Sequence, residues 1–270
     1  MRAGAVSLLF PPRCAACGEL LRFEGFGGGE LPVLCPGCAR QWESEKLSAC
    51  GRCGRPVFQC VCLTEELTDA GCAGFCKLVY YLNGRQPPVQ NRMLYHLKNT
   101  PDRRTAAFLA GELEEPVKAL LRQSGDPPLR DVALVFIPRS RRAVRQTGTD
   151  QARRLAKALS MRMGVPLIPA LIRRWGSGRQ QKALKRRERR QNAGKAYRLR
   201  RETDLRGKTV LLVDDIVTTG ASMAAAARLR RRAGAVRVCC VAVASDDCNQ
   251  SMGVRPPQLR EPPGRKSWRQ

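Results

Sequence analysis

The sequence contains few aromatic residues, few acidic residues and one histidine. Aromatic residues make up 5% of the 270 residues, and 23 Asp and Glu stand against 49 Lys and Arg, which gives a formal net charge of +26. Proteins that bind single-stranded nucleic acid usually combine positive groups with aromatic side chains that stack on the bases. The low aromatic content therefore argues against this kind of binding. The charge favours polyanionic partners, either nucleic acid or phosphorylated metabolites, and a general arginine bias on solvated faces is the alternative. The lone histidine, His96, is expected to be a packing or surface group.

Long apolar runs are also missing. Residues 5–10 are too short for the core of a signal peptide, and no stretch reaches the length that crosses a bilayer. We therefore expect a cytoplasmic protein with no membrane insertion. A Walker A loop is excluded, because Gly207-Lys208-Thr209 lacks the required glycine spacing and precedes its strand.

Cysteine, in contrast, is abundant, with 13 residues. Eight of them form four close pairs, Cys14 with Cys17, Cys35 with Cys38, Cys50 with Cys53, and Cys60 with Cys62. Two such pairs supply four thiolates to a tetrahedral ion, and pairing in sequence order predicts two structural Zn²⁺ sites. A disulfide framework is disfavoured in a reducing compartment, and the spacing does not favour an iron–sulfur cluster. The remaining cysteines before the tail, Cys72, Cys76, Cys239 and Cys240, are expected in the core.

The strongest chemical motif is Val213-Asp214-Asp215-Ile216-Val217-Thr218-Thr219-Gly220-Ala221-Ser222. It includes the end of the apolar run 210–213, which is typical of a strand buried on both faces of a parallel sheet. The two carboxylates follow that run at the edge where open α/β sheets bind ligands. Backbone N–H groups and hydroxyls then precede an alanine-rich helix, an arrangement that binds phosphate. An ordinary turn that caps the next helix is the alternative.

This motif resembles the signature of type I phosphoribosyltransferases, which bind phosphoribosyl pyrophosphate (PRPP). The resemblance implies that Asp214 and Asp215, the catalytic pair, hold the ribose hydroxyls. The 5′-phosphate would be wrapped by a loop made of Thr218, Thr219, Gly220, Ala221 and Ser222. Displacement of pyrophosphate from the anomeric carbon would need Mg²⁺ on the diphosphate. Arg139, in a basic turn after an expected strand, is the candidate for the leaving group, since its guanidinium offers a planar fork of donors. No residue stands out as a general base.

Alternating strand and helix patterns predict an α/β fold, with a type I phosphoribosyltransferase-like parallel sheet flanked by helices and a small N-terminal zinc-ribbon module. Strands are expected at 75–81, 132–137, 210–213 and 236–244, and helices near 91–98, 106–121, 150–159, 181–192 and 221–232. We assign residues 1–70 to a double zinc ribbon, 71–245 to the phosphoribosyltransferase-like domain and 246–270 to a disordered basic tail.

Zinc ribbons before such a domain resemble the ComF family of competence proteins, which is linked to the uptake of single-stranded DNA. Further short motifs occur in the family's order: Leu97-Lys98, Ile137-Pro138, Gly148-Thr149-Asp150-Gln151, Gln181-x2-Leu184 and Arg186-x-Glu188-Arg189-x2-Asn192. The sequence departs from the family at Thr147 and Thr149, which replace an arginine and an aromatic, at Asn99, which replaces an aromatic, and at Gly178, which replaces a threonine. PRPP binding is therefore better supported than transfer to a base.

Three functions remain open at this point. The protein is a phosphoribosyltransferase associated with DNA uptake, a non-catalytic protein that binds single-stranded DNA through the zinc module and the basic segment 186–190, or a PRPP-responsive regulator. A competence helicase-type protein is the partner that the resemblance implies.

Overall fold

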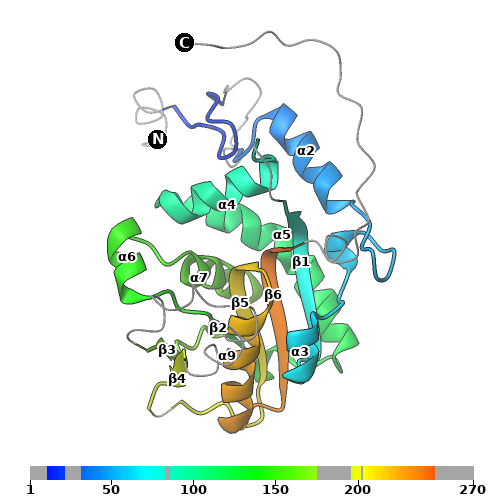
Figure 1. The fold of residues 1–270 in the computed structure, drawn as a ribbon, viewed down its shortest axis with the longest axis vertical. Coiled ribbons are helices and arrows are strands. Elements are labelled where there is room, and N and C mark those ends of the chain that lie inside the picture. The colour runs from blue at the N-terminus through cyan, green and yellow to red at the C-terminus, as the bar shows by residue number, and fades with distance from the viewer. Residues whose placement is uncertain (1–10, 22–31, 83–85, 175–195, 202, 247–270) are drawn as a thin grey trace.

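The computed structural model describes residues 11–21, 32–82, 86–174, 196–201 and 203–246. At its centre lies a four-stranded sheet with the order β1-β6-β5-β2, and each neighbouring pair is parallel (Figure 1). Its strands are β1 (Gly74–Tyr81), β2 (Val132–Phe136), β5 (Thr209–Val217) and β6 (Arg237–Asp246). A separate antiparallel pair joins β3 (Leu171–Arg173) to β4 (Tyr197–Leu199). The expected parallel sheet flanked by helices is thus confirmed.

Helices cover both faces of the sheet. The described helices are α2 (Pro36–Lys46), α3 (Glu65–Asp69), α4 (Val89–Asn99), α5 (Arg103–Gln123), α6 (Arg141–Thr147), α7 (Gln151–Met163) and α9 (Ala221–Arg232), with 3-10 turns η1 (Val57–Gln59) and η2 (Leu129–Asp131). One apolar cluster joins the sheet to α4, α5 and α7, and a second joins it to α3 and α9. Alternation along β5 explains this, since Leu211 and Val213 enter the first cluster while Val210 and Leu212 enter the second.

Strand β5 is longer than its apolar run predicts. Its pairing with β6 continues through Asp214 opposite Ala242 and Ile216 opposite Ala244. The ladder to β6 therefore holds both aspartates inside the last part of the strand instead of beyond it. The helix expected near 181–192 and the tail 247–270 lie outside the described residues.

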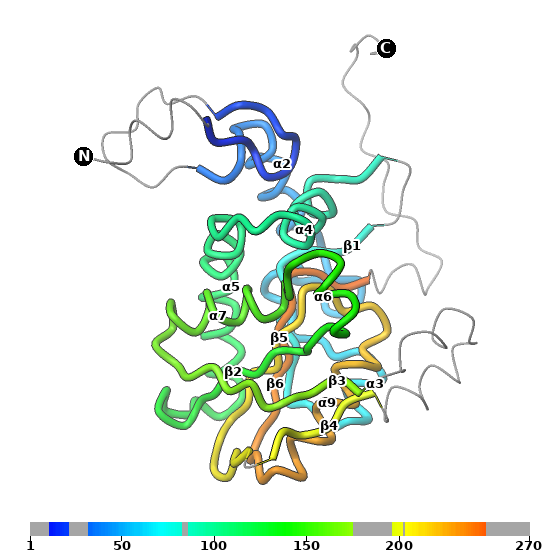
Figure 2. The backbone as a smooth tube through the Cα atoms, turned by 90° about the vertical axis from the view of Figure 1, so that its left-hand side faces the viewer, coloured from blue at the N-terminus to red at the C-terminus, as the bar shows by residue number. Residues whose placement is uncertain are grey.

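The cysteine-rich N-terminal residues gather around α2, beside α4 at one end of the molecule (Figure 2). Trp42 of α2 is 1% exposed, and its indole Nε1 donates to Glu112 Oε2 on α5 at 3.0 Å. At the sheet edge, the backbone N–H of Phe75 in β1 donates to the carbonyl of Val61 at 3.3 Å. The segment that carries the cysteine pairs is thus packed onto both the helical layer and the edge strand.

Among the described residues, none of the helices has both the length and the apolar character needed to traverse a bilayer.

Candidate functional site

The eight paired cysteines form two groups in chain order. The first contains Cys14, Cys17, Cys35 and Cys38, and the second contains Cys50, Cys53, Cys60 and Cys62; within each group the Sγ atoms lie within 4.8 Å of one another. Zn–S bonds of about 2.3 Å in a tetrahedron separate the sulfurs by roughly 3.8 Å. The Cys17–Cys35 and Cys50–Cys60 Sγ separations are 3.7 and 3.3 Å, which is far longer than a disulfide bond. Both groups can hold zinc, and the pairing in sequence order is confirmed.

Donors surround the thiols of both groups. The backbone N–H of Cys35 donates to Cys14 Sγ at 3.3 Å, and that of Cys62 donates to Cys60 Sγ at 3.4 Å. Burial alone would raise the pKa of Cys50, but the Tyr80 hydroxyl and nearby backbone N–H groups lower it to about 6. Cys50 therefore reaches the thiolate form that zinc requires at neutral pH, whereas burial raises the pKa of Cys60 and Cys62 in the same group and of Cys17 and Cys38 in the first group. The other expected core cysteines, Cys72, Cys76, Cys239 and Cys240, are indeed buried.

The two aspartates of the motif contact each other and one glutamine. Asp215 Oδ2 accepts a hydrogen bond from Gln151 Nε2 at 2.8 Å, and the backbone N–H of Asp215 donates to Asp214 Oδ1 at 2.9 Å. Asp150 caps α7 and also accepts from the backbone N–H of Arg139 at 3.2 Å. In the described part of the chain, no ion pair includes any of these three carboxylates. Among the described residues, these carboxylates are therefore not neutralised by ion pairs with arginine.

Burial has the largest effect on the pKa values of these acids. It raises the pKa of Asp214 well above the usual range, and the neighbouring charge of Asp215 raises it further. Burial also raises the pKa of Asp150, against the donors from Arg153 and Arg139 that lower it. Acids close together in a partly dry environment favour a ligand that brings hydroxyl donors or a cation.

The loop before α9 packs against the beginning of α3. Gly220 has φ +84°, and a Cβ there would lie 2.6 Å from Thr64 Oγ1. Thr64 Oγ1 also donates to the carbonyl of Thr219 at 3.4 Å. The backbone N–H of Ala221 donates to Thr219 Oγ1 at 3.3 Å, and Gly220, the N-cap residue of α9, has no side chain to accept from the other N–H groups of the first turn. The α9 N-terminus therefore has the polarity that attracts an anion.

Arg139 is fixed by the two threonines at which the sequence departs from the family. Its Nη1 donates to Thr147 Oγ1 at 2.9 Å and to the carbonyl of Thr149 at 3.2 Å. Thr149 Oγ1 in turn donates to the carbonyl of Lys98 on α4 at 3.0 Å. These threonines position the guanidinium beside the carboxyl ends of the central strands.

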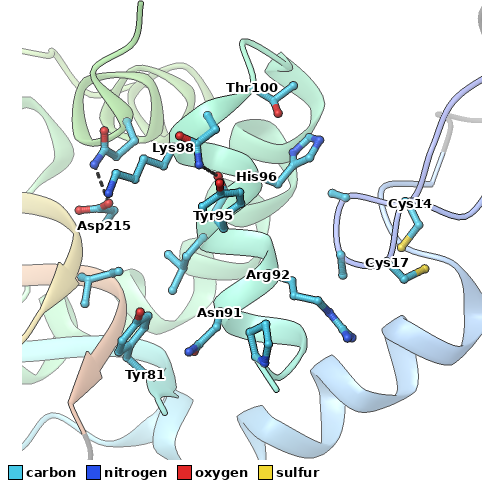
Figure 3. A pocket seen from close by; sticks show the side chains of 18 of the residues that line it. Cys14, Cys17, Tyr81, Asn91, Arg92, Tyr95, His96, Lys98, Thr100 and Asp215 are labelled. Carbon is cyan, nitrogen blue, oxygen red and sulfur yellow. Dashed lines mark hydrogen bonds between the residues drawn. The ribbon is translucent and has the colours of Figure 1, made fainter. Parts of the chain in front are cut away.

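A cleft of about 930 Å³ begins at this edge and runs along α4 to the first cysteine group (Figure 3). Asp215, Gln151 and Arg139 line one end, and Cys14 and Cys17 line the other. The wall from α4 includes several polar or aromatic side chains, namely Asn91, Arg92, Tyr95, His96, Lys98 and Asn99. The side chain of Lys98 extends from α4 toward Asp215 (Figure 3).

The structure brings only part of the predicted site into this cleft. Of the described residues, Asp215 and Arg139 line it, whereas Asp214 and residues 218–222 are not among its lining residues. Burial raises the pKa of Tyr197 in β4, and the charge of Asp214 raises it further, whereas Ser222 lowers it. The lining of the cleft therefore includes Asp215 of the two aspartates and none of the loop 218–222.

Gln151 is the site residue to which the sequence alone assigned no role. It is 6% exposed, lines the cleft, and keeps one buried amide oxygen, Oε1, without a hydrogen-bond partner. It belongs to one of the short family motifs, yet its contact with Asp215 joins positions 64 residues apart. Only the fold reveals that pairing. His96, by comparison, contacts Thr105 Oγ1 through Nδ1 at 3.1 Å.

The chain is similar in sequence to several known proteins. The phosphoribosyl transferase domain family matches residues 149–255. The DNA utilization protein YhgH of Salmonella typhi is 30% identical over 235 residues, which is 86% of this chain and 96% of that protein. The Salmonella typhimurium protein of that name is 29% identical over the same shares. The structure of TT1426 from Thermus thermophilus is 21% identical in sequence and has a TM-score of 0.31, over 59% of this chain and 86% of its own. On its similarity to these curated relatives and its phosphoribosyl transferase domain, the chain belongs to the ComF family.

Proposed function

We propose that this protein binds PRPP with Mg²⁺ at the edge of the sheet and serves as a phosphoribosyltransferase-like component in the handling of DNA. The observation that supports it best is the pair of aspartates at the carboxyl end of β5, which forms no ion pair among the described residues. Gln151 orients Asp215 next to Asp214 there. The relatives named for DNA utilization support the cellular setting.

The residue roles follow from the chemistry of the ligand. Asp214 and Asp215 accept hydrogen bonds from the ribose hydroxyls, and Arg139 holds the diphosphate through its guanidinium. The 5′-phosphate is assigned to the loop at the N-terminus of α9, made of Thr218, Thr219, Gly220, Ala221 and Ser222. Carboxylate oxygens at the same edge suit a hard cation, so Mg²⁺ fits there together with substrate phosphates. Two structural zinc ions complete the cofactor set.

Calorimetry with PRPP and Mg²⁺ on the purified protein and the Asp215→Ala variant tests the binding. We expect the wild type to bind and the variant to bind at least about tenfold more weakly, because an acceptor for a hydroxyl is lost. Asp204→Ala is the matched control, since Asp204 is exposed and pairs with Arg206 at 2.9 Å. Absence of binding by the wild type, or equal binding by Asp215→Ala, would contradict the proposal.

Transfer chemistry is measured separately, as release of pyrophosphate from PRPP with a panel of nucleobases. In this reaction the base nitrogen forms a bond to the anomeric carbon while the bond to pyrophosphate breaks. If PRPP binds in an Asp215-dependent way and no base releases pyrophosphate, the protein is a PRPP-responsive regulator.

Single-stranded DNA in the cleft is the second candidate function. The supporting observation is the row of Arg92, Lys98 and Arg139 along the cleft, with Tyr95 71% exposed beside them. Phosphate contacts by these groups release counterions, so affinity falls as salt rises. The sequence analysis also assigned the basic segment 186–190 to the binding of single-stranded DNA, and this segment lies outside the described residues.

A labelled oligothymidylate titrated at several salt concentrations tests this candidate. The double substitution Arg92→Gln/Lys98→Gln should reduce the slope of log K against log salt by about 1.4. Arg122→Gln, at an exposed position on α5, should leave the slope unchanged. Affinity that is indifferent to salt, or an unchanged slope in the double variant, would count against DNA binding in the cleft.

We further propose the division into a zinc-ribbon domain at 1–70, a phosphoribosyltransferase-like domain at 71–245 and a disordered basic tail at 246–270. Cytoplasmic location and a competence helicase-type partner belong to the same proposal. Cell fractionation and co-purification with a tagged chain test these two points.

A further inference from the structure

A lysine side chain is buried against the second cysteine group. Lys77 of β1 is 3% exposed, and its Nζ lies 3.3 Å from the Sγ of Cys60, which is 0% exposed. The ammonium also lies over the Phe75 ring, 5.0 Å from its centroid. Within the described ranges no ion pair includes Lys77. Since a buried ammonium without a counter-charge is strongly unfavourable, the thiolates of this group are its natural counter-charge.

The charge of a filled site explains why a lysine is useful here. Four thiolates around Zn²⁺ carry a net charge of about −2, which is unfavourable in a buried environment. The ammonium of Lys77 offsets half of it and donates a charge-assisted hydrogen bond to sulfur. Strand β1 thus supplies a donor to one ligand of this site.

The first cysteine group has a different environment. Within the described residues, the Sγ of Cys17 lies 3.9 Å from the Oε2 carboxylate oxygen of Glu19, a side chain outside the group. Among the described residues, no lysine or arginine donates a hydrogen bond to its four sulfurs. Cys14 and Cys17 also line the cleft, and Cys17 is exposed. The two groups have the same ligand type but opposite surroundings.

We propose that Lys77 is a charge-compensating residue of the second zinc site, which makes that site less reactive than the first. The N–H···S bond withdraws electron density from Cys60 and joins the site to the edge of the sheet. The first site, open to the cleft and beside a carboxylate, keeps nucleophilic thiolates. The inference depends on zinc in both groups and is independent of PRPP binding.

Pulsed alkylation of the zinc-loaded protein with N-ethylmaleimide, read by peptide mass spectrometry, tests it. Cys17 and Cys53 form a matched pair, since each is the exposed second cysteine of its first knuckle. In the wild type we expect Cys17 to react faster than Cys53. Lys77→Met should raise the rate at Cys53 by about tenfold with no change at Cys17, because the second site loses the positive charge that offsets half of its net negative charge. Lys77→Arg, which keeps the charge and the donors, should restore the slow rate.

Cobalt substitution gives a readout that simple destabilisation does not mimic. Without the ammonium, the sulfur lone pairs rise in energy, so the thiolate-to-cobalt charge-transfer band of Lys77→Met should move to longer wavelength. Equal rates at Cys17 and Cys53 in the wild type would overturn the proposal, and this comparison needs no variant. An equal acceleration of both cysteines in Lys77→Met would also overturn it, because that is the result of general unfolding.

Discussion

At the scale of single residues, the site depends on an amide that orients an acid. Gln151 Nε2 holds Asp215 Oδ2 at 2.8 Å, while Gln151 Oε1 has no partner and lies at the cleft. An oriented carboxylate binds hydroxyl groups better than a mobile one, because less conformational freedom is lost on binding. Gln151 is therefore a positioning residue for the proposed ribose site.

Substitution of Gln151 should weaken PRPP binding without removing it. Gln151→Leu deprives Asp215 of its donor, and we expect an affinity loss of about tenfold in calorimetry. Gln151→Glu places another carboxylate beside Asp215, so its affinity should fall to the value of the Leu variant or below as pH rises and both acids ionise. Gln123→Leu, at an exposed position near the end of α5, is the control. Wild-type affinity in Gln151→Leu would remove the glutamine from the site.

The raised pKa of Asp214 gives a prediction about stability and pH. Because its folded pKa lies above its unfolded value, the folded state retains the proton more strongly. The corresponding stabilisation is complete below about pH 4 and is lost as pH rises through the folded pKa. Asp214→Asn has no such proton, so it should become more stable than the wild type at pH 8, by about 1.4 kcal/mol for each unit of pKa elevation.

Urea denaturation at pH 5 and pH 8 measures this difference. Asp204→Asn serves as the control, because hydrogen bonds from Arg206 lower the pKa of Asp204 and its side chain is exposed. If the difference between wild type and Asp214→Asn is the same at both pH values, the pKa of Asp214 in the folded protein is not raised, which would contradict the prediction.

At the scale of elements, α3 supports the loop that begins α9. Leu67 of α3 is 0% exposed and belongs to the same apolar cluster as Met223 of α9. Thr64, the N-cap of α3, contacts the carbonyl of Thr219 and leaves no room for a side chain at Gly220. The proposed phosphate loop is therefore shaped by a helix that lies immediately after the second cysteine group.

Gly220→Ala should destabilise the protein by about 2 kcal/mol. A left-handed conformation costs an L-residue roughly 1–2 kcal/mol, and the new methyl group would overlap Thr64 Oγ1. Thr64→Ala relieves the overlap, so the double variant should lose less stability than the two single losses added together. Gly111→Ala, inside α5 with a flexible guanidinium 3.4 Å away, should be neutral or stabilising by up to about 1 kcal/mol. Strict additivity in thermal or urea unfolding would show that the two positions are not in contact.

The elements of the fold follow from local signals in the sequence. The buried parallel strands were predictable from apolar runs such as 210–213, and the helix 221–232 matches α9, Ala221–Arg232. Cysteine pairing in chain order was predictable from spacing. The extension of β5 to Val217 was not, because it depends on pairing with β6 around Asp214 and Ile216, polar or isolated residues that carry no strand pattern.

The site was predictable only where a single segment of the chain provides its residues. The motif around Asp214 and Asp215 carries the carboxylates and the proposed phosphate loop in one continuous stretch, so it was recognisable. The cleft combines α4, Gln151 and the Cys14 knuckle, which are distant in sequence, and no local pattern records their proximity. Lys77 reads as an ordinary strand residue until the fold brings it to Cys60.

At the scale of the whole molecule, the cysteine-rich segment and the sheet share one core. A single apolar cluster extends from Cys14, Cys35 and Trp42 to Leu113 on α5 and Val241 on β6. The N-terminal segment also covers the outer side of β1, an edge strand that would otherwise present unpaired backbone groups. We therefore expect zinc binding and the stability of the sheet to be coupled.

Removal of zinc should consequently destabilise the phosphoribosyltransferase-like sheet as well as the N-terminal segment. We expect calorimetry of the zinc-loaded protein to give one transition, and treatment with EDTA and a reversible mercurial reagent to lower its midpoint by roughly 10 °C or more. Once the ligands are released, Val61 no longer pairs with Phe75, so the amides of β1 should exchange hydrogen faster than those of the central strand β5. Displacement of the mercurial by an excess of dithiothreitol, followed by added zinc, should restore the midpoint. A sheet transition that stays at its original temperature after complete zinc loss would mean that the two parts fold independently, and the shared cluster would then be an interface between domains instead of a common core.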